Sequence, residues 1–315
     1  MKSIKKIIIT LLISTVGAGA VFSQSGLTET APALSSQIFS RINFNPAGMG
    51  NTEKINLFSL NRLQWLGFEG HPTSCVLNLH YFNESIKSGF GGAFSYDAID
   101  SYKAINAKFA YSYNLDINPN SLLSLGVSAG INQLASDHSN DIYDITTDFI
   151  PDTSSITPDF NFGVEYSYKD LLIGAAINHI GQMKKPNSTN LQVQSYYAYA
   201  RYLYSINKEW DIAPSFMYAN ISQLNVMNLS AVAYYNNSYF DGEYYWAGLG
   251  YRFGSALSFM VGMEWDFLRI AYTYELPMGD SMNLSANTHE LMLSFIIPVK
   301  ADPAKAAAKG KKRRR

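Results

Sequence analysis

The sequence has one cysteine, few charged residues and almost no helical periodicity, and each shortage excludes a class of protein. Cys75 is the only cysteine, so no disulfide forms within the chain, and we expect this residue to act as a small apolar side chain in a strand. The five histidines are scattered, without the spacing to another His or Cys that a metal site needs. Neither a nucleophile elbow nor a phosphate-binding glycine loop occurs. We therefore expect no catalytic site, no cofactor and no metal, and predict that the chain is not an enzyme.

A long hydrophobic run occurs only at the start of the chain. Three lysines precede the apolar stretch 7–20, and Val21 and Ser23 stand at positions minus three and minus one before Gln24. This pattern predicts a secretory signal peptide over residues 1–23. No later run is long enough for a membrane-spanning helix. We expect an exported chain without a helical anchor.

Charge is unevenly distributed along the chain. Lys and Arg total 24, of which three lie in the signal peptide and seven after residue 304, so the remaining 14 face 25 Asp and Glu. An acidic body with a balance of −11 therefore ends in a basic tail, residues 300–315. The candidates for partner binding in this tail are its seven basic residues after position 304: Lys305, Lys309, Lys311, Lys312, Arg313, Arg314 and Arg315.

Apolar and polar residues alternate strictly over long stretches, which is typical of β-strands. In "LLSLGVSAGIN", Leu125 and Val127 fall on one face while Ser124 and Ser128 fall on the other. Late in the chain, "LSFMVGMEW" sets an apolar face against Ser258, Gly262 and Glu264. Tyrosine and phenylalanine, at 22 and 18 residues, agree with an all-β composition. The runs that we expect to be strands are 53–66, 73–83, 87–97, 101–115, 119–134, 157–168, 170–181, 191–207, 209–220, 224–235, 242–254, 255–265, 268–277 and 287–299.

Two arrangements of such strands fit this alternation: a transmembrane β-barrel and a secreted sandwich. The runs are mostly about 10–13 residues long, which suits a tilted membrane strand better than the usual soluble strand of about 5–6. Aromatic residues concentrate toward the ends of the runs, as at a membrane interface. We therefore predict an all-β fold, a transmembrane antiparallel β-barrel of about 14 strands over residues 53–299. Because the strand number is even, both termini lie on one side, which we expect to be the periplasm. The turns "NESIKS", "DINPN", "YKD" and "NKE" lie on that side as well. The connections 135–156, 182–190 and 278–286 then face outward.

The order of several stretches resembles the PorP/SprF family of type IX secretion outer-membrane proteins. The N-terminal segment, residues 24–52, contains "SSQIFSRINFNPAGMGN", and "NRLQWLGFEGHP" and "TSCVLNLHYF" follow it. Later come "YKDLLIGAAINHI", "YWAGLGYRFGSALSFMVGMEW", "LRIAYTYE" and "THELMLSF". "NPAGMG" alone is weak, because fatty-acid-transporter-like barrels carry a similar stretch. The chain is most similar to the PorP core component rather than to an adhesin-dedicated SprF paralogue, although the basic tail departs from the usual family ending.

The resemblance implies a barrel that supports export of cargo proteins bearing a C-terminal secretion domain. It also implies partners: outer-membrane lipids, a periplasmic peptidoglycan-binding lipoprotein, ring components of the secretion machine and the cargo itself. The alternative is a barrel for small hydrophobic molecules, like the fatty-acid transporters. A tail this basic is also typical of nucleic-acid binding, but export excludes that partner, so we expect the tail to meet an acidic protein surface or anionic lipids, or to be a solvated end.

Arg62, in "NRLQW", has two interpretations. Its guanidinium could line the lumen and hold the N-terminal segment there by donating to backbone carbonyls, or it could be an interfacial arginine beside Trp65. The nearby Gly67, Gly70 and Pro72 fit a tight outward loop.

Inward-facing charges of both signs are expected in the lumen, either paired across strands or lining a permeation path. Glu264 and Arg269 flank the short turn 265–268 and could form an ion pair. An acidic loop with Asp137, Asp141, Asp144, Asp148 and Asp152 could hold calcium but lacks the spacing of an EF-hand, which favours a solvated loop. The lumen-facing charged candidates are Arg62, Glu165, Arg201, Glu264, Arg269, Glu275 and Glu290.

Overall fold

The structure is a computed structural model that describes residues 35–39, 41–50, 54–67, 70–136, 153–182, 193–221, 224–236, 243–265, 267–279 and 287–298. The expected signal peptide, the acidic loop 137–152 and the tail 300–315 lie outside the described residues. Over the residues described, no helix is long and apolar enough to cross a membrane.

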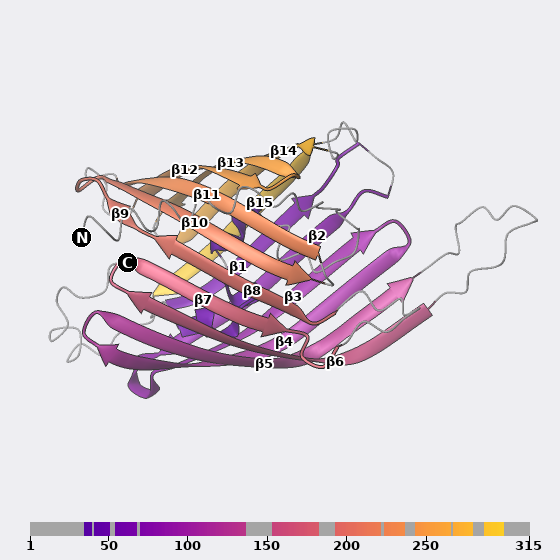
Figure 1. Ribbon diagram of the computed structural model, residues 1–315, viewed down its shortest axis with the longest axis horizontal. Coiled ribbons are helices and arrows are strands. Elements are labelled where there is room, and N and C mark those ends of the chain that lie inside the picture. The colour runs from indigo at the N-terminus through magenta and orange to yellow at the C-terminus, as the bar shows by residue number, and fades with distance from the viewer. Residues whose placement is uncertain are drawn as a thin grey trace, which may run out of the picture.

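The described chain is almost entirely antiparallel β-strand (Figure 1). Each of the expected runs overlaps one long strand, and the run 191–207 also contains a second, two-residue strand. The strands are β1 (Lys54–Leu63), β2 (Thr73–Asn83), β3 (Ser88–Ile99), β4 (Tyr102–Asn118), β5 (Ser121–Ser136), β6 (Thr153–Tyr168), β7 (Leu171–Asn178), β8 (Ser195–Tyr202), β9 (Tyr204–Ser205), β10 (Trp210–Ile221), β11 (Leu224–Asn236), β12 (Glu243–Arg252), β13 (Ala256–Trp265), β14 (Leu268–Pro277) and β15 (Thr288–Pro298).

These strands close into a barrel. Each long strand pairs with its neighbours in the sequence, β10 pairs with both β8 and β11, and β1 pairs with β15. Within the described residues the closed sheet has 14 strands, and the two-residue β9 is an additional edge pairing on β10. The prediction of an antiparallel barrel of about 14 strands is confirmed, and closure removes the free edges that invite aggregation.

The two ends of the barrel differ in their connections. Lys54 begins β1 opposite Pro298 at the end of β15, so both ends of the sheet lie at one rim, called here the terminal rim. The turn with the 3-10 helix η5 (Glu84–Ile86) and the two-residue turns 119–120 and 169–170 lie at this rim. The strand ends that flank residues 137–152, 179–194 and 278–287 lie at the opposite rim, called here the loop rim.

The loop after β1 turns tightly, as its composition predicts. Gly67 and Gly70 have φ values of +115° and +70°, which glycine adopts without the steric cost that a side chain would add. The loop returns the chain to β2, where Gln64 donates its backbone N–H to the carbonyl of Pro72 at 2.9 Å.

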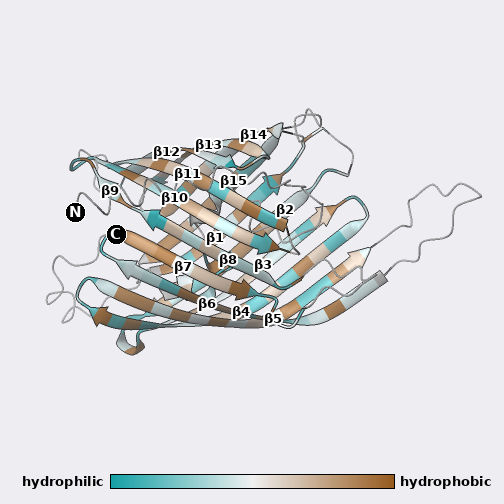
Figure 2. Cartoon of the chain, viewed as in Figure 1, coloured by the Kyte–Doolittle hydropathy of each residue, from teal (hydrophilic) through white to brown (hydrophobic). Residues whose placement is uncertain are grey.

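Side chains alternate between lipid and lumen along the strands, and Figure 2 shows this alternation as hydrophobic and hydrophilic bands. On β5, Val127 is 51% exposed on the outer surface, whereas Ser128 is buried inside. Cys75 is half-buried on the outward-facing register of β2, as expected for a small apolar residue in a strand. The outer surface therefore presents the continuous apolar band that a bilayer requires.

The lumen contains more apolar surface than the sequence pattern suggests. The inward positions discussed above are mostly small, polar or charged, but a buried apolar cluster lies inside one half of the barrel. Met260, Ala271 and Met292 face the lumen from β13, β14 and β15, where they alternate with polar inward residues. Their outward neighbours are apolar too, so the alternation does not mark these three residues as inward. The cluster consists of Phe58, Leu60, Val76, Val232, Trp246, Met260, Ala271 and Met292.

Several strand boundaries differ from the expected runs, and two of the differences have a clear local cause. β6 begins at Thr153 rather than 157, because Thr153 to Ile156 continue the ladder with Ser136 to Gln133 of β5. β7 ends at Asn178 rather than 181, because His179 has a φ of 55° and its backbone N–H donates to the Asn161 side chain at 2.9 Å. The hydrophobic pattern locates the strands but not these local interruptions.

Candidate functional site

Residues 35–39 and 41–50 form a plug inside the barrel. Its 3-10 helices are η2 (Ser35–Phe39), η3 (Arg41–Asn43) and η4 (Pro46–Gly50). η4 lies against β2 to β6, whereas η2 lies against β15. The plug therefore crosses the lumen from one wall to the other.

The Asn-Pro-Ala-Gly stretch anchors the plug to the wall. Asn45 is fully buried, and its Oδ1 accepts the backbone N–H of Ala47 at 2.9 Å, which starts η4 with Pro46 at a position where no N–H is needed. The Nδ2 of Asn45 donates to the carbonyl of Val164 at 3.1 Å and to the hydroxyl of Tyr199 at 2.9 Å. A cap for η4 and a link to β6 and β8 thus come from one amide.

Close packing brings η4 directly against the backbone of β5. A Cβ on Gly126 would lie 2.2 Å from the backbone nitrogen of Ala47, closer than real side chains approach. Position 126 therefore has no room for a side chain, because the plug touches the wall at that point.

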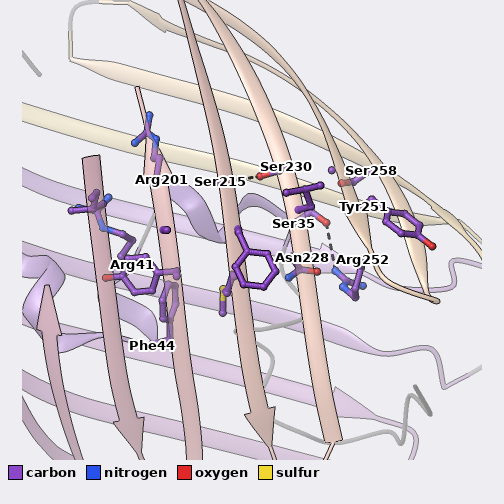
Figure 3. A pocket seen from close by; sticks show the side chains of 17 residues that line it. Ser35, Arg41, Phe44, Arg201, Ser215, Asn228, Ser230, Tyr251, Arg252 and Ser258 are labelled. Carbon is purple, nitrogen blue, oxygen red and sulfur yellow. Dashed lines mark hydrogen bonds between the residues drawn. The ribbon is translucent and has the colours of Figure 1, made fainter. Parts of the chain in front are cut away.

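Arg41 and Phe44, both labelled in Figure 3, join the plug to β6 and β8. Arg41 Nε donates to Glu165 Oε2 at 2.8 Å, and the Tyr199 hydroxyl donates to the same oxygen at 2.6 Å. Burial lowers the pKa of the Arg41 guanidinium, but Glu165 and Tyr199 together raise it by more, so the net shift is upward and Arg41 stays charged. The Phe44 ring meets the Tyr199 ring edge to face, with centroids 5.4 Å apart.

The opposite wall holds Asn43. Lys108 Nζ on β4 donates to its carbonyl at 2.8 Å, and Asn78 Nδ2 on β2 donates to its side-chain Oδ1 at 2.9 Å. The plug is thus fixed on both sides of η3 by side chains from well-separated strands.

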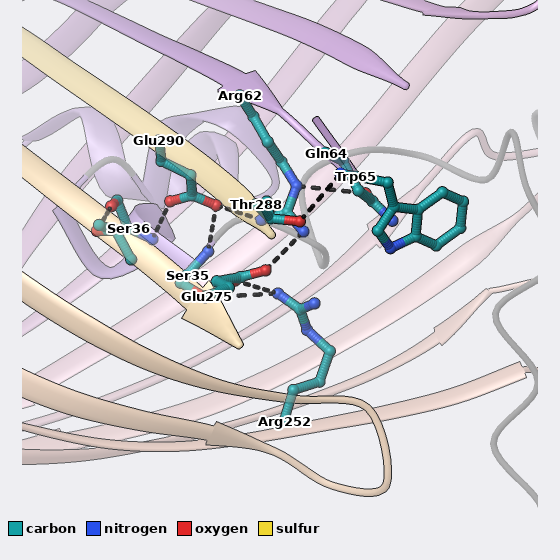
Figure 4. Close-up of polar contacts among 10 residues, drawn as sticks. Ser35, Ser36, Arg62, Gln64, Trp65, Arg252, Glu275, Thr288 and Glu290 are labelled. Carbon is teal, nitrogen blue, oxygen red and sulfur yellow. Dashed lines mark hydrogen bonds and ion pairs between the residues drawn. The ribbon is translucent and has the colours of Figure 1, made fainter. Parts of the chain in front are cut away.

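Four charged side chains form a buried network where β1, β12, β14 and β15 meet (Figure 4). Arg62 Nη2 lies 2.7 Å from Glu275 Oε2, and its Nη1 lies 2.6 Å from Glu290 Oε1. Arg252 Nη2 lies 3.0 Å from Glu275 Oε1. All four residues are at most 6% exposed, so each charge depends on the others for the solvation that it has lost.

This network binds the start of the plug. The backbone N–H groups of Ser35 and Ser36 donate to the two carboxylate oxygens of Glu290 at 2.9 and 3.0 Å. The Ser35 hydroxyl donates to Glu275 Oε1, and the Ser36 hydroxyl lies 2.8 Å from Thr273 Oγ1. Arg62 therefore acts on the plug through two carboxylates, rather than by donating to plug carbonyls.

The structure places the expected lumenal charges as follows. Arg62, Glu275 and Glu290 come together in the network, and Arg62 is 1% exposed in the lumen, so it is not an interfacial arginine beside Trp65. Glu264 and Arg269 form a separate, partly exposed pair, with Arg269 Nε donating to Glu264 Oε2 at 2.9 Å. Glu165 pairs with the plug.

Arg201 differs from the other candidates. Within the described residues it has no ion pair with a carboxylate, and its Nη2 donates to the hydroxyl of Tyr234 at 3.1 Å. Its guanidinium also lies over the Tyr234 ring, 5.7 Å from the centroid. The tail candidates, residues 305–315, lie outside the described residues.

Sequence reasoning missed several lumenal polar residues. Alternation from Trp246 onward predicts that Arg252 of β12 faces inward. Its ion pair with Glu275 could not be predicted in this way, because Glu275 lies two strands away, on β14. Arg41 stands in the "FSRINFNPAG" stretch, which has no strand periodicity from which its direction could be inferred.

A further polar cluster, also missed, lies near the loop rim. Asp159 is fully buried, and His179 Nδ1 lies 2.8 Å from its Oδ1. Asn106 and Asn161 donate to Asp159 Oδ2 at 2.9 and 3.1 Å. These bonds join β4, β6 and the end of β7, so the cluster supports the wall. Across the described part of the chain, His, Cys, Asp and Glu nowhere gather in threes as metal ligands.

A cavity remains between the plug and one wall. It has an empty volume of about 580 Å³, part of which is open to solvent. Ser35, Arg41 and Phe44 border it on the plug side, and β7, β8 and β10 to β13 border it on the wall side. Its guanidinium groups belong to Arg41, Arg201 and Arg252, and the described residues that line it include no carboxylate.

A plugged barrel with this N-terminal stretch can be compared with known proteins. Residues 28–295 match the model of the family described as type IX secretion system membrane protein PorP/SprF. The chain belongs to the PorP/SprF family. Comparison with curated proteins found no significant match.

Solved outer-membrane barrels share the fold of this PorP/SprF member at low identity. The Pseudomonas putida toluene transporter TodX has a TM-score of 0.53 at 11% identity, with 89% of this chain and 100% of that chain covered. The CymD monoaromatic hydrocarbon channel has a TM-score of 0.52 at 13% identity, covering 89% and 94%. A Pseudomonas aeruginosa FadL homologue has a TM-score of 0.50 at 11% identity, covering 81% and 92%. These similarities concern the fold alone.

Proposed function

We propose that this barrel is a non-enzymatic component of the type IX secretion machine that supports export of cargo proteins with a C-terminal secretion domain. Family membership supports a role in this secretion system. The observation that carries the proposal is the plug, which Glu290, Glu165 and Lys108 hold from three parts of the wall. A lumen crossed in this way favours a docking and anchoring component over the conduit for a folded protein.

The barrel also links the outer membrane to periplasmic parts of the machine in this proposal. Both ends of the sheet lie at the terminal rim, so one orientation in the membrane presents both chain termini to the periplasm. The partners on that side are a peptidoglycan-binding lipoprotein and ring components, and the basic tail contributes to their binding. Outer-membrane lipids contact the apolar outer surface.

Deletion of the gene followed by fractionation tests this function. A cargo protein with a C-terminal secretion domain should accumulate in the periplasm of the deletion strain and return to the surface or the medium when the wild-type gene is restored. The amount of an unrelated outer-membrane barrel serves as the control for general envelope damage. Export of the cargo at wild-type rate in the deletion strain would contradict the proposal.

The alternative is transport of small hydrophobic molecules. The apolar residues around the cavity, among them Phe44, Leu172 and Met217, favour it, but the plug and the buried charges cross the same lumen. The deletion strain separates the two functions. If the barrel is a transporter, the strain takes up a probe such as toluene more slowly and exports its cargo normally. If it is a secretion component, the strain takes up toluene at the wild-type rate and retains its cargo in the periplasm.

A further inference from the structure

The cavity between the plug and the wall exists because several inward residues in one row of the barrel are small. Cross-strand pairing places Arg201 beside Ser215, Ser215 beside Ser230, and Ser230 beside Gly250. Gly250 is in turn paired with Ser258, and a Cβ on Gly250 would lie 2.4 Å from the hydroxyl of that serine. The plug does not fill this row, so space remains between its η2–η3 side and the wall (Figure 3).

Arg201 gives the cavity an uncompensated positive charge. Of the three guanidinium groups around it, that of Arg41 pairs with Glu165 and that of Arg252 pairs with Glu275. Arg201 stands at one end of the row of small residues, and in the described part of the chain its polar partner is the neutral hydroxyl of Tyr234. Its Nε is buried without a hydrogen-bond acceptor. A cation with incomplete solvation inside a barrel attracts an anion.

The remaining lining fits an anion that carries an apolar group. Leu172 is the cross-strand neighbour of Arg201 on β7, and Met217 lies two residues beyond Ser215 on β10, on the same face. The Phe44 ring closes this side from the plug. The hydroxyls of Ser215 and Ser230 lie 2.7 Å apart, between the guanidinium and the far end of the row. One of them donates to the other, so the second is free to donate to an acceptor.

We propose that this cavity binds a small organic carboxylate, with the carboxylate on the Arg201 guanidinium and its apolar body against Phe44, Leu172 and Met217. A guanidinium donates two parallel hydrogen bonds to a carboxylate, which an ammonium group or a hydroxyl cannot do. The site is independent of the secretion role, because it requires only the plugged barrel. The carboxylate could belong to an aliphatic or an aromatic acid, and the lining accepts either.

Calorimetric titration of the full-length barrel in a nonionic detergent tests the site. Hexanoate and benzoate are the two probes, and hexan-1-ol, which matches hexanoate without the charge, is the control ligand. We expect saturable binding of at least one acid and at least tenfold weaker binding of the alcohol. Hexanoate alone indicates an aliphatic body and benzoate alone an aromatic one, and either result supports the site.

Two variants separate the charge from the space. Arg201→Gln should weaken acid binding at least tenfold and leave heat-modifiable gel mobility and thermal unfolding unchanged, since it removes a charge that no carboxylate in the described residues balances. Ser230→Leu fills the row without changing any charge and should weaken binding to a similar extent. The proposal is wrong if neither acid binds saturably, if the alcohol binds as tightly as hexanoate, or if Arg201→Gln binds the acid like the wild type.

Discussion

Arg62 and Glu290 are directly opposed on β1 and β15, the first and last strands of the barrel, with Arg62 Nη1 2.6 Å from Glu290 Oε1. The same Glu290 carboxylate accepts the backbone N–H groups of Ser35 and Ser36. One side chain therefore links the seam at which the sheet closes to the segment that fills its lumen.

Glu290→Gln should loosen the start of the plug. The amide keeps the size of the carboxylate but removes its charge, which leaves Arg62 with one carboxylate fewer and weakens the acceptors for Ser35 and Ser36. Breaking one side of a buried ion pair costs about 3–5 kcal/mol. We expect faster hydrogen exchange in residues 35–39 and a lower unfolding temperature, both measured on the purified barrel.

Glu264→Gln is the matched control for that change. It also removes one carboxylate from an ion pair with arginine, but the Glu264–Arg269 pair is partly exposed to solvent. An exposed pair contributes about 0–1 kcal/mol, so this variant should unfold close to the wild-type temperature. Equal effects of the two variants would show that Glu290 does not hold the plug.

Gly126→Leu should displace the η4 part of the plug. Any side chain at this inward position meets the backbone of Ala47, because its Cβ would lie 2.2 Å from the Ala47 nitrogen, so a leucine requires η4 to move away from β5. We expect the barrel to assemble with a higher single-channel conductance in planar bilayers than the wild type. Gly92→Leu is the control, because a Cβ on Gly92 has no atom nearer than 3.8 Å. If Gly126→Leu conducts no more than Gly92→Leu, the plug does not limit ion flow.

Val127→Arg should block assembly. Val127 is 51% exposed in the middle of β5, on the outer surface, and a cation at mid-bilayer depth costs about 2–4 kcal/mol. Val127→Leu, and the inward Ser230→Gln, should both assemble. Ser128, which accepts a hydrogen bond from Asn161 at 2.9 Å inside the wall, is too tightly packed to serve as the inward control. Heat-modifiable gel mobility measures assembly, and equal tolerance at Val127 to Leu and Arg would contradict its contact with lipid.

Removal of residues 305–315 should weaken partner binding without affecting the barrel. The seven positive charges after residue 304 act only on surfaces that they nearly touch, because the Debye length is about 8 Å at physiological ionic strength. We expect the truncated protein to assemble but to co-purify less lipoprotein and ring component than the full-length chain at low salt. This difference should shrink at higher salt, where the tail charges of the full-length chain are screened as well. Unchanged co-purification and unchanged cargo export would identify the tail as a solvated end.

The strands of the barrel could be predicted from the sequence because their signal is local. An alternation such as Val127 against Ser128 requires no knowledge of the neighbouring strand, and 14 such runs determine a closed sheet. Local departures were not predictable in this way. His179, for example, ends β7 through a hydrogen bond to Asn161 of β6.

The lumenal site was predictable only in part. Arg62, Glu275 and Glu290 were expected to face inward from their strand positions, but their grouping depends on strand order and on register across the seam. The plug residues Arg41 and Asn45 have no periodic pattern, and their contacts are to strands 119 or more residues away in the sequence. Such contacts arise from the closed barrel, and no local stretch encodes them.

The hydrogen bond from Ser35 to Glu290 also constrains the order of assembly. Its two ends are 255 residues apart, so it forms only after the last strand has been synthesised, exported and inserted beside the first. Filling of the lumen and closure of the sheet are then completed together, at the end of biogenesis, since Glu290 takes part in both. An intermediate that lacks its last strand therefore has an open seam, and it also lacks the Glu290 carboxylate that binds the start of the plug.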